Sequence, residues 1–530
     1  MILYHAISSY QLIEVVLHKL IYNNEETSIL MISKDVTRRL PQYEKFNQYF
    51  ADIIIYDNGI GNYSILKGNG LHEYFNNFFR QSKYNLNSFE KIYLACAHHS
   101  FGIYLCETNH HFIMFEDGAG AISRPEILEL VEKKFVNKNE LAKKYGLYNG
   151  LGNLIDYCIY NAKFQESGFQ SSEKWVNFDV AEILNSLDFK VRDNLTHIFT
   201  QMDKINVPQK SALILTEHFA NLRIFSWEKQ IVLYQLLADY FLQDYHLIFK
   251  PHPDDLMYYS ELFPNSDIIK DKFPAEILPY MFNTTPDLVA TISSTAIYGL
   301  QQCFKEKLQF NYEFSHKKKQ FLHLNKYYSI LNHIALNQIK KIYILGVNNV
   351  IINNLCKFNK FAFDNIVYID DLNCNIEDNS AIIIDESPLP VAEYSQTICS
   401  FLDDLSEFVY VYFVNSNNDY CFYNYDYKYI WKNIYPIEIR KTKTREKDLY
   451  IDLNTEYVYL YIKGMKNIMK NTFEKELIYS GVTVSTIIED DKDLKIKMLQ
   501  GMLAATEKRL LYYIEKSSKN NTNGKDNFKE

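Results

Sequence analysis

The amino-acid sequence predicts an α/β protein with two doubly wound halves in succession, followed by an additional α/β region. Two observations support this prediction. Short apolar runs alternate with helical patterns through residues 1–330, which is typical of parallel sheets covered by helices. The chain is also 530 residues long, too long for one ordinary hydrophobic core, so we expect several domains.

The first half is expected to hold five strands separated by helices. Helical patterns follow the first strand at 9–23 and the fourth at 98–108. The segment 125–200 is aromatic, and we expect it to be mostly helical. The expected strands are ILYHAI (2–7), TSILMIS (27–33), DIIIYDN (52–58), KIYLACA (91–97) and HFIMFEDGAG (111–120).

The alternation restarts after residue 205, which we take as the boundary between the halves. The long helical pattern at 226–242 separates the first two strands of the second half, and a shorter one covers 274–282. The expected strands lie in SALILTEHF (211–219), YHLIFKPHP (245–253) and DLVATISSTAIYGL (287–300). The predicted domains are therefore 1–205, 206–335 and 336–530.

The third region begins as strand, turn and helix at 340–359 and resembles a small Rossmann-like unit. Its LGVNNV turn has one glycine where a dinucleotide fingerprint needs three, which favours a structural or partner-binding role over cofactor binding. The segment 494–516 predicts an amphipathic helix with a basic side, for which we expect core or homo-oligomer contacts ahead of peripheral membrane contact. Residues 517–530 are expected to be disordered.

Composition excludes several classes of protein. A net charge of −9 and a pI near 5.9 argue against general nucleic-acid binding, which needs a basic face. The eight cysteines form no CxxC pair, so neither a zinc ribbon nor a disulfide framework is indicated. The sequence lacks a signal-peptide pattern and an apolar run of about 18 residues. We therefore expect a cytoplasmic protein, at most peripheral at the inner face of the membrane.

Polar residues of types that bind ligands or take part in catalysis follow three of the expected strands. In open α/β sheets, ligands bind beyond the carboxyl ends of the strands. One strand runs into two prolines, which end strand pairing and hold a lysine and a histidine on a stiff segment suited to an anion. The three groups are Glu116-Asp117-Gly118, Lys250-Pro251-His252-Pro253 and Ser293-Ser294-Thr295.

Each group alone has an ordinary structural explanation. Ser293 or Ser294 can be a simple helix N-cap, His252 a turn residue, and Glu116-Asp117-Gly118 a common turn sequence. Hydroxyls at a helix N-terminus, however, also form a ready phosphate site. The occurrence of all three groups at strand ends, in both halves, favours a functional site.

The order of these motifs resembles that of the bacterial sialyltransferases, and most closely the capsule polysialyltransferase type. The segments ACAHHSFGIYL (95–105) and LTEHFANLRIFSWEKQ (215–230) also fit that layout. The resemblance covers about residues 1–330. It implies a glycosyltransferase B (GT-B) fold, in which two Rossmann-like domains face a cleft, and it leaves residues 340–530 without an account.

The resemblance implies an inverting enzyme that uses a CMP-activated sugar. Such chemistry needs a base for the acceptor hydroxyl, and Glu116 is our choice, with Asp117 as the second candidate and Gly118 permitting the tight turn. His252, Ser293 and Ser294 would meet the charge on the departing phosphate. We expect no metal or other cofactor, since the leaving group carries one phosphate.

Further residues are assigned to substrate binding. Thr216, Glu217 and His218 follow another strand of the second half and are expected to line the cytidine pocket. His99, next to His98, is expected to contact the acceptor; we argue against a metal site there because adjacent residues on a helix point in different directions. Lys250 contributes charge or caps its strand, and Pro253 and Thr295 complete the predicted donor site.

The expected donor is CMP-sialic acid, and the acceptor is an oligosaccharide or glycolipid of capsule or lipooligosaccharide synthesis. The closest alternative is a CMP-Kdo transferase of capsule or lipopolysaccharide assembly, because Kdo transferases have similar motifs. A CDP-glycerol-type teichoic acid polymerase is a further alternative, although that family is generally basic. A non-catalytic polysaccharide-binding protein on a GT-B scaffold is the alternative from another class. No nucleic-acid partner is expected.

Overall fold

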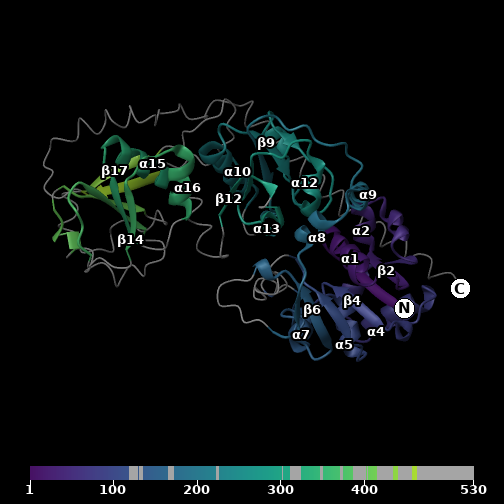
Figure 1. Cartoon of the computed structure of the whole chain (residues 1–530). Helices are drawn as coiled ribbons and strands as arrows, with labels where there is room; N and C mark the ends of the chain where they lie inside the picture. Colours follow the sequence, from purple (N-terminus) through teal and green to yellow (C-terminus); the bar gives the residue numbers. More distant parts are fainter. Residues whose placement is uncertain are drawn as a thin grey trace. The chain divides into compact units, whose positions relative to one another are not determined.

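The computed structural model describes most of the first 310 residues and parts of the third region (Figure 1). The described residues are 1–118, 129, 135–164, 172–222, 226–300, 303–310, 324–345, 350–369, 374–385, 401–402, 404–406, 408–414, 434–439 and 456–461. Their strands form three sheets, which follow one another along the chain. Among the described residues, no helix is long and apolar enough to cross a membrane.

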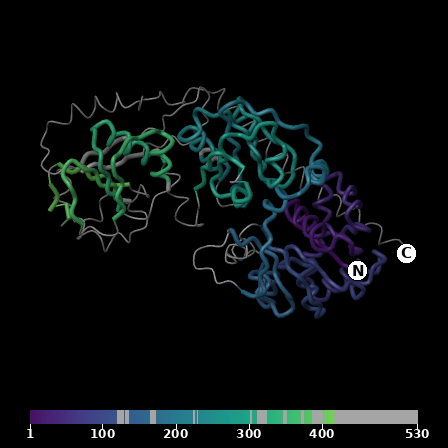
Figure 2. Tube along the Cα trace, in the orientation of Figure 1, coloured from purple at the N-terminus to yellow at the C-terminus, as the bar shows by residue number. Residues whose placement is uncertain are grey.

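The first sheet has the order β3-β2-β1-β4-β5-β6-β7, and all its neighbouring strands are parallel. This is the Rossmann order, which reverses direction between β1 and β4 and so creates a topological switch point there. Figure 2 lets the reader follow this part of the chain from purple to blue. The strands are β1 (Ile2–Ala6), β2 (Ser28–Ser33), β3 (Asp52–Tyr56), β4 (Lys91–Ala95), β5 (Phe112–Phe115), β6 (Ile155–Tyr160) and β7 (Trp175–Asn177).

Helices cover both faces of this sheet. Successive residues of a strand point to opposite faces, so Leu3 packs in one hydrophobic cluster and Tyr4 in the other. Helices α1 and α2 cover the face of Tyr4, whereas α4 and α5 cover the face of Leu3 (Figure 1). The helices are α1 (Ser9–Tyr22), α2 (Lys34–Arg39), α3 (Asn58–Ser64), α4 (Gly70–Gln81), α5 (Ser100–Glu107), α7 (Val136–Lys144), α8 (Val180–Ser186) and α9 (Phe189–Phe199), with short 3-10 helices η1 (Tyr43–Gln48), η2 (Leu86–Ser88) and η3 (Ala162–Phe164).

The expectation of a mostly helical segment at 125–200 was wrong for its middle part. Residues 155–160 and 175–177 form β6 and β7, which extend the sheet beyond β5. The β6 sequence IDYCIY is rich in aromatic and β-branched residues, which favour strands. Its last three residues are buried, so this run lacks the simple alternation that marks a strand with one face in water.

The second sheet repeats the Rossmann order as β10-β9-β8-β11-β12. Its order reverses between β8 and β11, which pair in parallel. The expected helix at 274–282 divides into a 3-10 turn and one short helix. The elements are β8 (Ser211–Leu215), α10 (Trp227–Phe241), β9 (His246–Lys250), α11 (Tyr259–Leu262), β10 (Asp267–Ile268), η4 (Ala275–Ile277), α12 (Leu278–Met281), β11 (Leu288–Thr291), α13 (Ala296–Leu300) and β12 (Glu306–Gln309).

The third sheet has the order β14-β13-β15-β16-β18-β17, with a parallel part from β14 to β16 and antiparallel pairing at β18 and β17. The strand expected at the start of this region is present as β13, and β14 and β15 follow it along the chain. Residues 346–349 of the LGVNNV turn and the segment 494–530 lie outside the described residues. The elements are α15 (Leu324–Leu336), β13 (Lys341–Leu345), α16 (Val350–Asn359), β14 (Asn365–Ile369), β15 (Ser380–Asp385), β16 (Tyr410–Val414), β17 (Ile434–Ile439) and β18 (Glu456–Tyr461).

The chain forms two compact units that do not coincide with the three sheets. One unit comprises Met1–Thr216, Ile248–Pro253 and Ile268–Lys307, and the other comprises Glu217–Leu247, Asp254–Asp267 and Leu308–Glu530. The first unit therefore contains the first sheet and the strand ends Thr216, Lys250 and Thr291 of the second sheet.

Contacts within each unit join segments that are far apart in the sequence. In the first unit, the Thr200 hydroxyl donates to Asp271 over 2.7 Å. In the second unit, Asn359 of α16 donates to the carbonyl of Tyr240 in α10 over 2.9 Å. Helix α15 packs on the third sheet, where the His333 Nδ1 lies 2.6 Å from the Tyr412 hydroxyl. The three sheets lie within the predicted ranges 1–205, 206–335 and 336–530, but α15 associates with the third of them.

Two sheets in the Rossmann order, the first of them wholly parallel, confirm the predicted α/β class. The order of each sheet places a switch point within it, and the predicted polar groups follow a strand that flanks this point or the strand beside it. We therefore expect ligands to bind at the carboxyl ends of β1, β4 and β5 and of β8, β9 and β11.

Candidate active site

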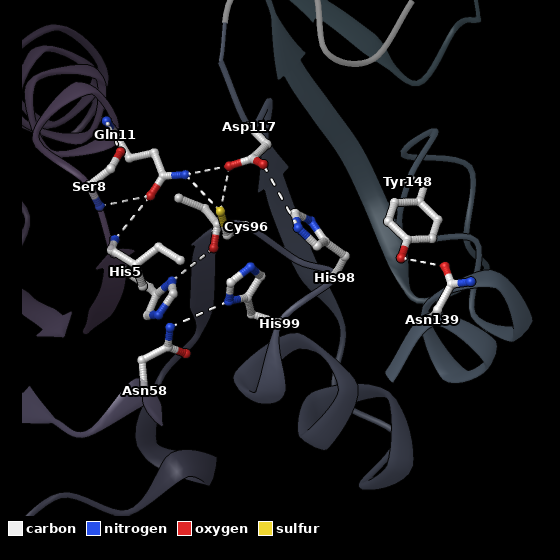
Figure 3. Close-up of polar contacts among 12 residues, drawn as sticks. His5, Ser8, Gln11, Asn58, Cys96, His98, His99, Asp117, Asn139 and Tyr148 are labelled. Atoms are coloured by element: carbon white, nitrogen blue, oxygen red, sulfur yellow. Dashed lines mark hydrogen bonds and ion pairs between the residues drawn. The ribbon is translucent and has the colours of Figure 1, made fainter. Parts of the chain in front are cut away.

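Polar side chains from three strand ends of the first sheet form one hydrogen-bonded network (Figure 3). They come from the first turn of α1, which follows β1, from the turn after β4 and from the end of β5. Because β1 and β4 flank the switch point, their carboxyl ends are where a ligand is expected in such a sheet.

Asp117 is the centre of this network. The Gln11 side-chain amide donates to its Oδ1 over 2.8 Å, and the Cys96 thiol donates to the same oxygen. The His98 Nε2 lies 3.8 Å from its Oδ2. Gln11 is itself fixed, because its Oε1 accepts the backbone N–H groups of Ile7 and Ser8. Asp117 is thus held in one orientation by groups from two strand ends.

Glu116, the residue before Asp117, is buried and contacts β6 and the residue after it. Its Oε2 accepts the backbone N–H of Asn161 over 3.1 Å, and its own N–H donates to the Ile159 carbonyl. The residue is 1% exposed, whereas the Asp117 side chain is 17% exposed. Gly118 follows with a φ of 125°, a conformation that glycine adopts readily, which supports the expected role of Gly118 in the turn.

His98 and His99 lie in a tight turn and not in a helix. The expected helix at 98–108 begins only at Ser100, and the His99 N–H donates to the Cys96 carbonyl over 2.9 Å. The argument from helix geometry therefore does not apply, and the two rings lie 4.6 Å apart. His99 contacts Asn58, whose amide nitrogen is 3.4 Å from the ring Nδ1.

Burial governs the protonation of this turn. It lowers the pKa of His98 to about 3, and the nearby charge of Lys138 acts in the same direction. Burial likewise lowers the pKa of His99 well below its usual range, and it raises the pKa of the Cys96 thiol. At neutral pH the turn therefore presents two uncharged imidazoles and a thiol.

Gly102 allows this turn to pack against the first turn of α5. A Cβ at position 102 would lie 1.9 Å from the Ala97 carbonyl oxygen, which is backbone and cannot rotate away. We predict that Gly102→Ala lowers the free energy of unfolding by about 1–3 kcal/mol, the usual cost of overpacking. Urea denaturation would measure it.

Gly299→Ala is the matched control, because a Cβ there meets its nearest atom only at 3.6 Å. It should change stability little. Equal stabilities for the two variants would show that the turn does not depend on the close approach at Gly102.

Two buried glutamates near the site were not found by sequence reasoning. Burial, with the negative charges of Glu116, Asp117 and Glu276 nearby, raises the pKa of Glu14 well above its usual range. Glu14 is 2% exposed, and its Oε2 has no hydrogen-bond partner among the described residues. A glutamate within the apolar run QLIEVVL was the available signal. At Glu276, which follows β10, burial raises the pKa to about 7.

A pH dependence of stability follows from Glu276. Its pKa is about 7 in the folded protein against 4.5 ordinarily, so between these values the folded state binds more protons than the unfolded state. Stability therefore falls as pH rises through this window, and the loss is complete above about pH 7. We compare the free energy of unfolding of Glu276→Gln with that of the wild type. As pH rises from 4.5 to 8, we predict that the difference changes by on the order of 3 kcal/mol in favour of the variant.

Chemical denaturation at these two pH values would measure the difference. Glu261→Gln, at an exposed glutamate, is the control and should follow the wild type. If the free energy of unfolding of Glu276→Gln changed with pH by the same amount as that of the wild type, Glu276 would not be the source of the pH dependence.

Three strand ends of the second sheet are joined by hydrogen bonds. The Thr216 N–H donates to the Lys250 carbonyl over 3.2 Å, and the His252 N–H donates to the Thr216 hydroxyl over 3.3 Å. The Thr291 hydroxyl donates to the Leu215 carbonyl and accepts the Ser294 N–H, both over 3.0 Å. The predicted residues His252 and Ser294 therefore lie on a backbone framework centred on the β8–β11 switch point.

The Lys250 side chain turns into the protein. Its Nζ donates to the Asp271 carbonyl over 3.0 Å and lies 4.6 Å from the centre of the Phe273 ring. Burial lowers its pKa to about 8, although the charge of Asp271 acts in the opposite direction. Lys250 is thus engaged with the segment after β10, a contact that its sequence position did not reveal.

The serine group sits at the start of a very short helix. Helix α13 has five residues, Ala296–Leu300, and the Ser294 hydroxyl accepts the Ala296 N–H over 3.4 Å. This supports a capping role for Ser294 beside the predicted phosphate role. Pro253, Ser293 and Thr295 are partly exposed.

Glu217 and His218 come soon after β8 in the sequence, but they belong to the second compact unit. The Tyr234 hydroxyl donates to the Glu217 carboxylate over 2.7 Å and accepts the Glu217 N–H. Gln230 binds the Glu217 carbonyl and the Ala220 N–H of the same loop. Glu217 therefore organises its own loop, while His218 is partly exposed.

The fold is of the GT-B type, with two Rossmann-type sheets in succession and polar groups at their strand ends. Residues 5–309 match the model of the alpha-2,8-polysialyltransferase (POLYST) family. Since the match spans more than half of the chain, the protein belongs to this family, and the predicted resemblance is confirmed. No curated protein matches the sequence significantly.

Two solved structures are similar to this chain at low sequence identity. An alpha/beta-galactoside alpha-2,3-sialyltransferase from the luminous marine bacterium Photobacterium phosphoreum has a TM-score of 0.40 and 13% identity, covering 69% of this chain and 97% of that one. The glycotransferase of kitacinnamycin has a TM-score of 0.35 and 11% identity, covering 61% and 84%.

Proposed function

We propose that the protein transfers sialic acid from CMP-sialic acid to a hydroxyl of a glycan, with inversion and without a metal cofactor. Membership of the polysialyltransferase family supports a sialyltransferase. The observation that carries the proposal is that polar groups follow the carboxyl ends of strands at or beside the switch point in both sheets. Carboxylates follow β5, and His252 and Ser294 follow β9 and β11.

The proposed reaction is a single displacement. The acceptor oxygen attacks the anomeric carbon of sialic acid, the bond from that carbon to the phosphate oxygen breaks, and CMP leaves with the electron pair. Glu116, or else Asp117, takes the proton of the acceptor hydroxyl. A base fixed in position contributes without reorganisation, and both carboxylates are held by backbone or side-chain donors.

The leaving group develops charge on one phosphate. His252 and the hydroxyls of Ser293 and Ser294 would stabilise this charge, with Thr295, Pro253 and the backbone around them shaping the site. Thr216 positions His252 through its hydroxyl, and Glu217 and His218 would border the cytidine. Lys250 would act indirectly, because its buried Nζ holds the segment after β10 through the Asp271 carbonyl.

We also propose an acceptor and a cellular location for the enzyme. The acceptor is an oligosaccharide or glycolipid of capsule or lipooligosaccharide synthesis, with His99 on the acceptor side of the network. The protein would work in the cytoplasm, at most peripherally attached to the membrane.

Release of CMP from a panel of donors tests the proposal with the full-length protein. CMP release from CMP-sialic acid, and none from CMP-Kdo or CDP-glycerol, is the expected result. Release with CMP-Kdo alone would assign the protein to Kdo transfer and overturn the donor. Release from CDP-glycerol alone would indicate a polymerase of the teichoic acid type, and no release would indicate a non-catalytic binding protein.

A further inference from the structure

The turn after β4 brings together three metal-binding side chains. Cys96, His98 and His99 each offer one ligand atom, and these atoms all lie within 4.8 Å of one another (Figure 3). Zinc bonds of about 2.0–2.3 Å in a tetrahedron separate the ligand atoms by about 3.5 Å. The side chains are thus about one ångström of movement away from a coordinating arrangement.

This group is built on a fixed backbone. Cys96 has a φ of 52°, a left-handed conformation that is uncommon for a residue with a side chain. The bond from the His99 N–H to the Cys96 carbonyl closes the turn, and the close packing of Gly102 on Ala97 holds it against α5. Sites on such supported segments keep their ligands in place.

A fourth ligand is adjacent. The Cys96 thiol donates to Asp117 Oδ1, and the His98 Nε2 lies 3.8 Å from Asp117 Oδ2. One sulfur, two imidazole nitrogens and one carboxylate oxygen form a ligand set that suits zinc, whereas magnesium and calcium prefer oxygen ligands.

An independent observation at His98 also indicates a missing ligand. His98 is 2% exposed, and its Nδ1 is buried with no hydrogen-bond partner in the part of the chain that the structure describes. A buried polar atom without a partner costs stability. A cation bound at Nδ1 would give this nitrogen the partner that it lacks, with Nε2 remaining beside Asp117.

We propose that Cys96, His98 and His99, with Asp117 as fourth ligand, bind a divalent cation of the zinc class. On binding, the Cys96 thiol gives its proton to solvent and a metal–sulfur bond forms. This inference goes beyond the proposed reaction, which uses no metal. Because the cation would engage Asp117 beside Glu116, we expect it to inhibit the enzyme.

Cobalt absorption tests binding without reference to catalysis. The full-length protein, freed of metal by EDTA, would be titrated with Co²⁺, whose bond to a thiolate gives a strong near-ultraviolet band. We expect one Co²⁺ per chain with that band and with visible bands of tetrahedral symmetry, all displaced by Zn²⁺. Cys96→Ala should abolish the thiolate band, and Cys96→Ala and His98→Gln should each lower zinc affinity by at least about a hundredfold.

Cys106→Ala is the matched control, since Cys106 is another buried cysteine in α5 of the same domain. It should keep the spectrum. The inference fails if the wild type shows no thiolate band, if Cys96→Ala keeps it, as binding at the exposed Cys303 would produce, or if His98→Gln binds zinc normally.

Activity gives a second readout, with each variant compared to its own rate after EDTA. Zinc should inhibit the wild type and Cys106→Ala, and it should have little effect on Cys96→Ala. Magnesium should not inhibit in place of zinc. Zinc binding without any turnover would leave this inference intact and refute the proposed function. Activation by zinc would overturn both the inhibition and the metal-free reaction.

Discussion

Glu116→Gln is expected to lower the turnover of the full-length enzyme by about a hundredfold or more. The substitution keeps the size of the side chain and can preserve a hydrogen bond to the Asn161 N–H, but it removes the atom that accepts the proton. Initial rates of transfer at saturating donor and acceptor would measure the loss, with circular dichroism to confirm folding.

Asp117→Asn is the companion variant. If Glu116 is the base, Asp117→Asn should act more weakly, through the positions of Gln11, Cys96 and His98 that it holds. A larger loss in Asp117→Asn than in Glu116→Gln would make Asp117 the base. Near-normal rates in both variants would refute the assignment of the site.

His252→Ala is the second variant with a large expected effect, again about a hundredfold in turnover. The imidazole is expected to meet the charge on the departing phosphate, which is greatest in the transition state, so turnover should fall more than donor binding. The backbone bond from the His252 N–H to the Thr216 hydroxyl does not depend on the side chain, so the variant should fold.

His246→Ala is the control, because His246 starts the same strand and pairs with Asp267 at the surface. It should retain turnover. A His252→Ala enzyme with unchanged turnover and weaker donor binding would show that the residue binds the donor without stabilising the leaving group.

Much of the first two sheets could be predicted from the sequence because their strands are apolar runs that end at polar residues. ILYHAI, KIYLACA and SALILTEHF form strands where expected. Parallel strands bring their carboxyl ends to one edge, so the positions of Glu116, His252 and Ser294 at the ends of β5, β9 and β11 were also predictable.

Contacts between distant segments could not be predicted in this way. Gln11 and Asp117 meet because β1 and β5 both end at the same edge, but the individual hydrogen bond depends on the capping of α1 by Ser8. The burial of Glu14 and Glu276 results from packing between segments far apart in sequence. The turn at Cys96–His99 depends on a left-handed residue that is not glycine, for which the sequence carries no clear signal.

The association of α15 with the third sheet has the same kind of cause. Its amphipathic pattern shows that one face is buried, but not which sheet buries it. The contact of His333 with Tyr412 joins residues on either side of the predicted boundary at 335. Sequence periodicity defines a face, and only the tertiary structure defines its partner.

Transfer to a defined acceptor is the most direct test of the central claim. A fluorescent sialylated oligosaccharide would be incubated with CMP-sialic acid, the wild-type protein and EDTA, and the product examined by mass spectrometry and by NMR of the new linkage. We predict a product heavier by one or more sialic acid residues, with an inverted anomeric centre. An unchanged acceptor in the presence of intact, folded enzyme across a panel of glycans, or a product with retained configuration, would contradict the account.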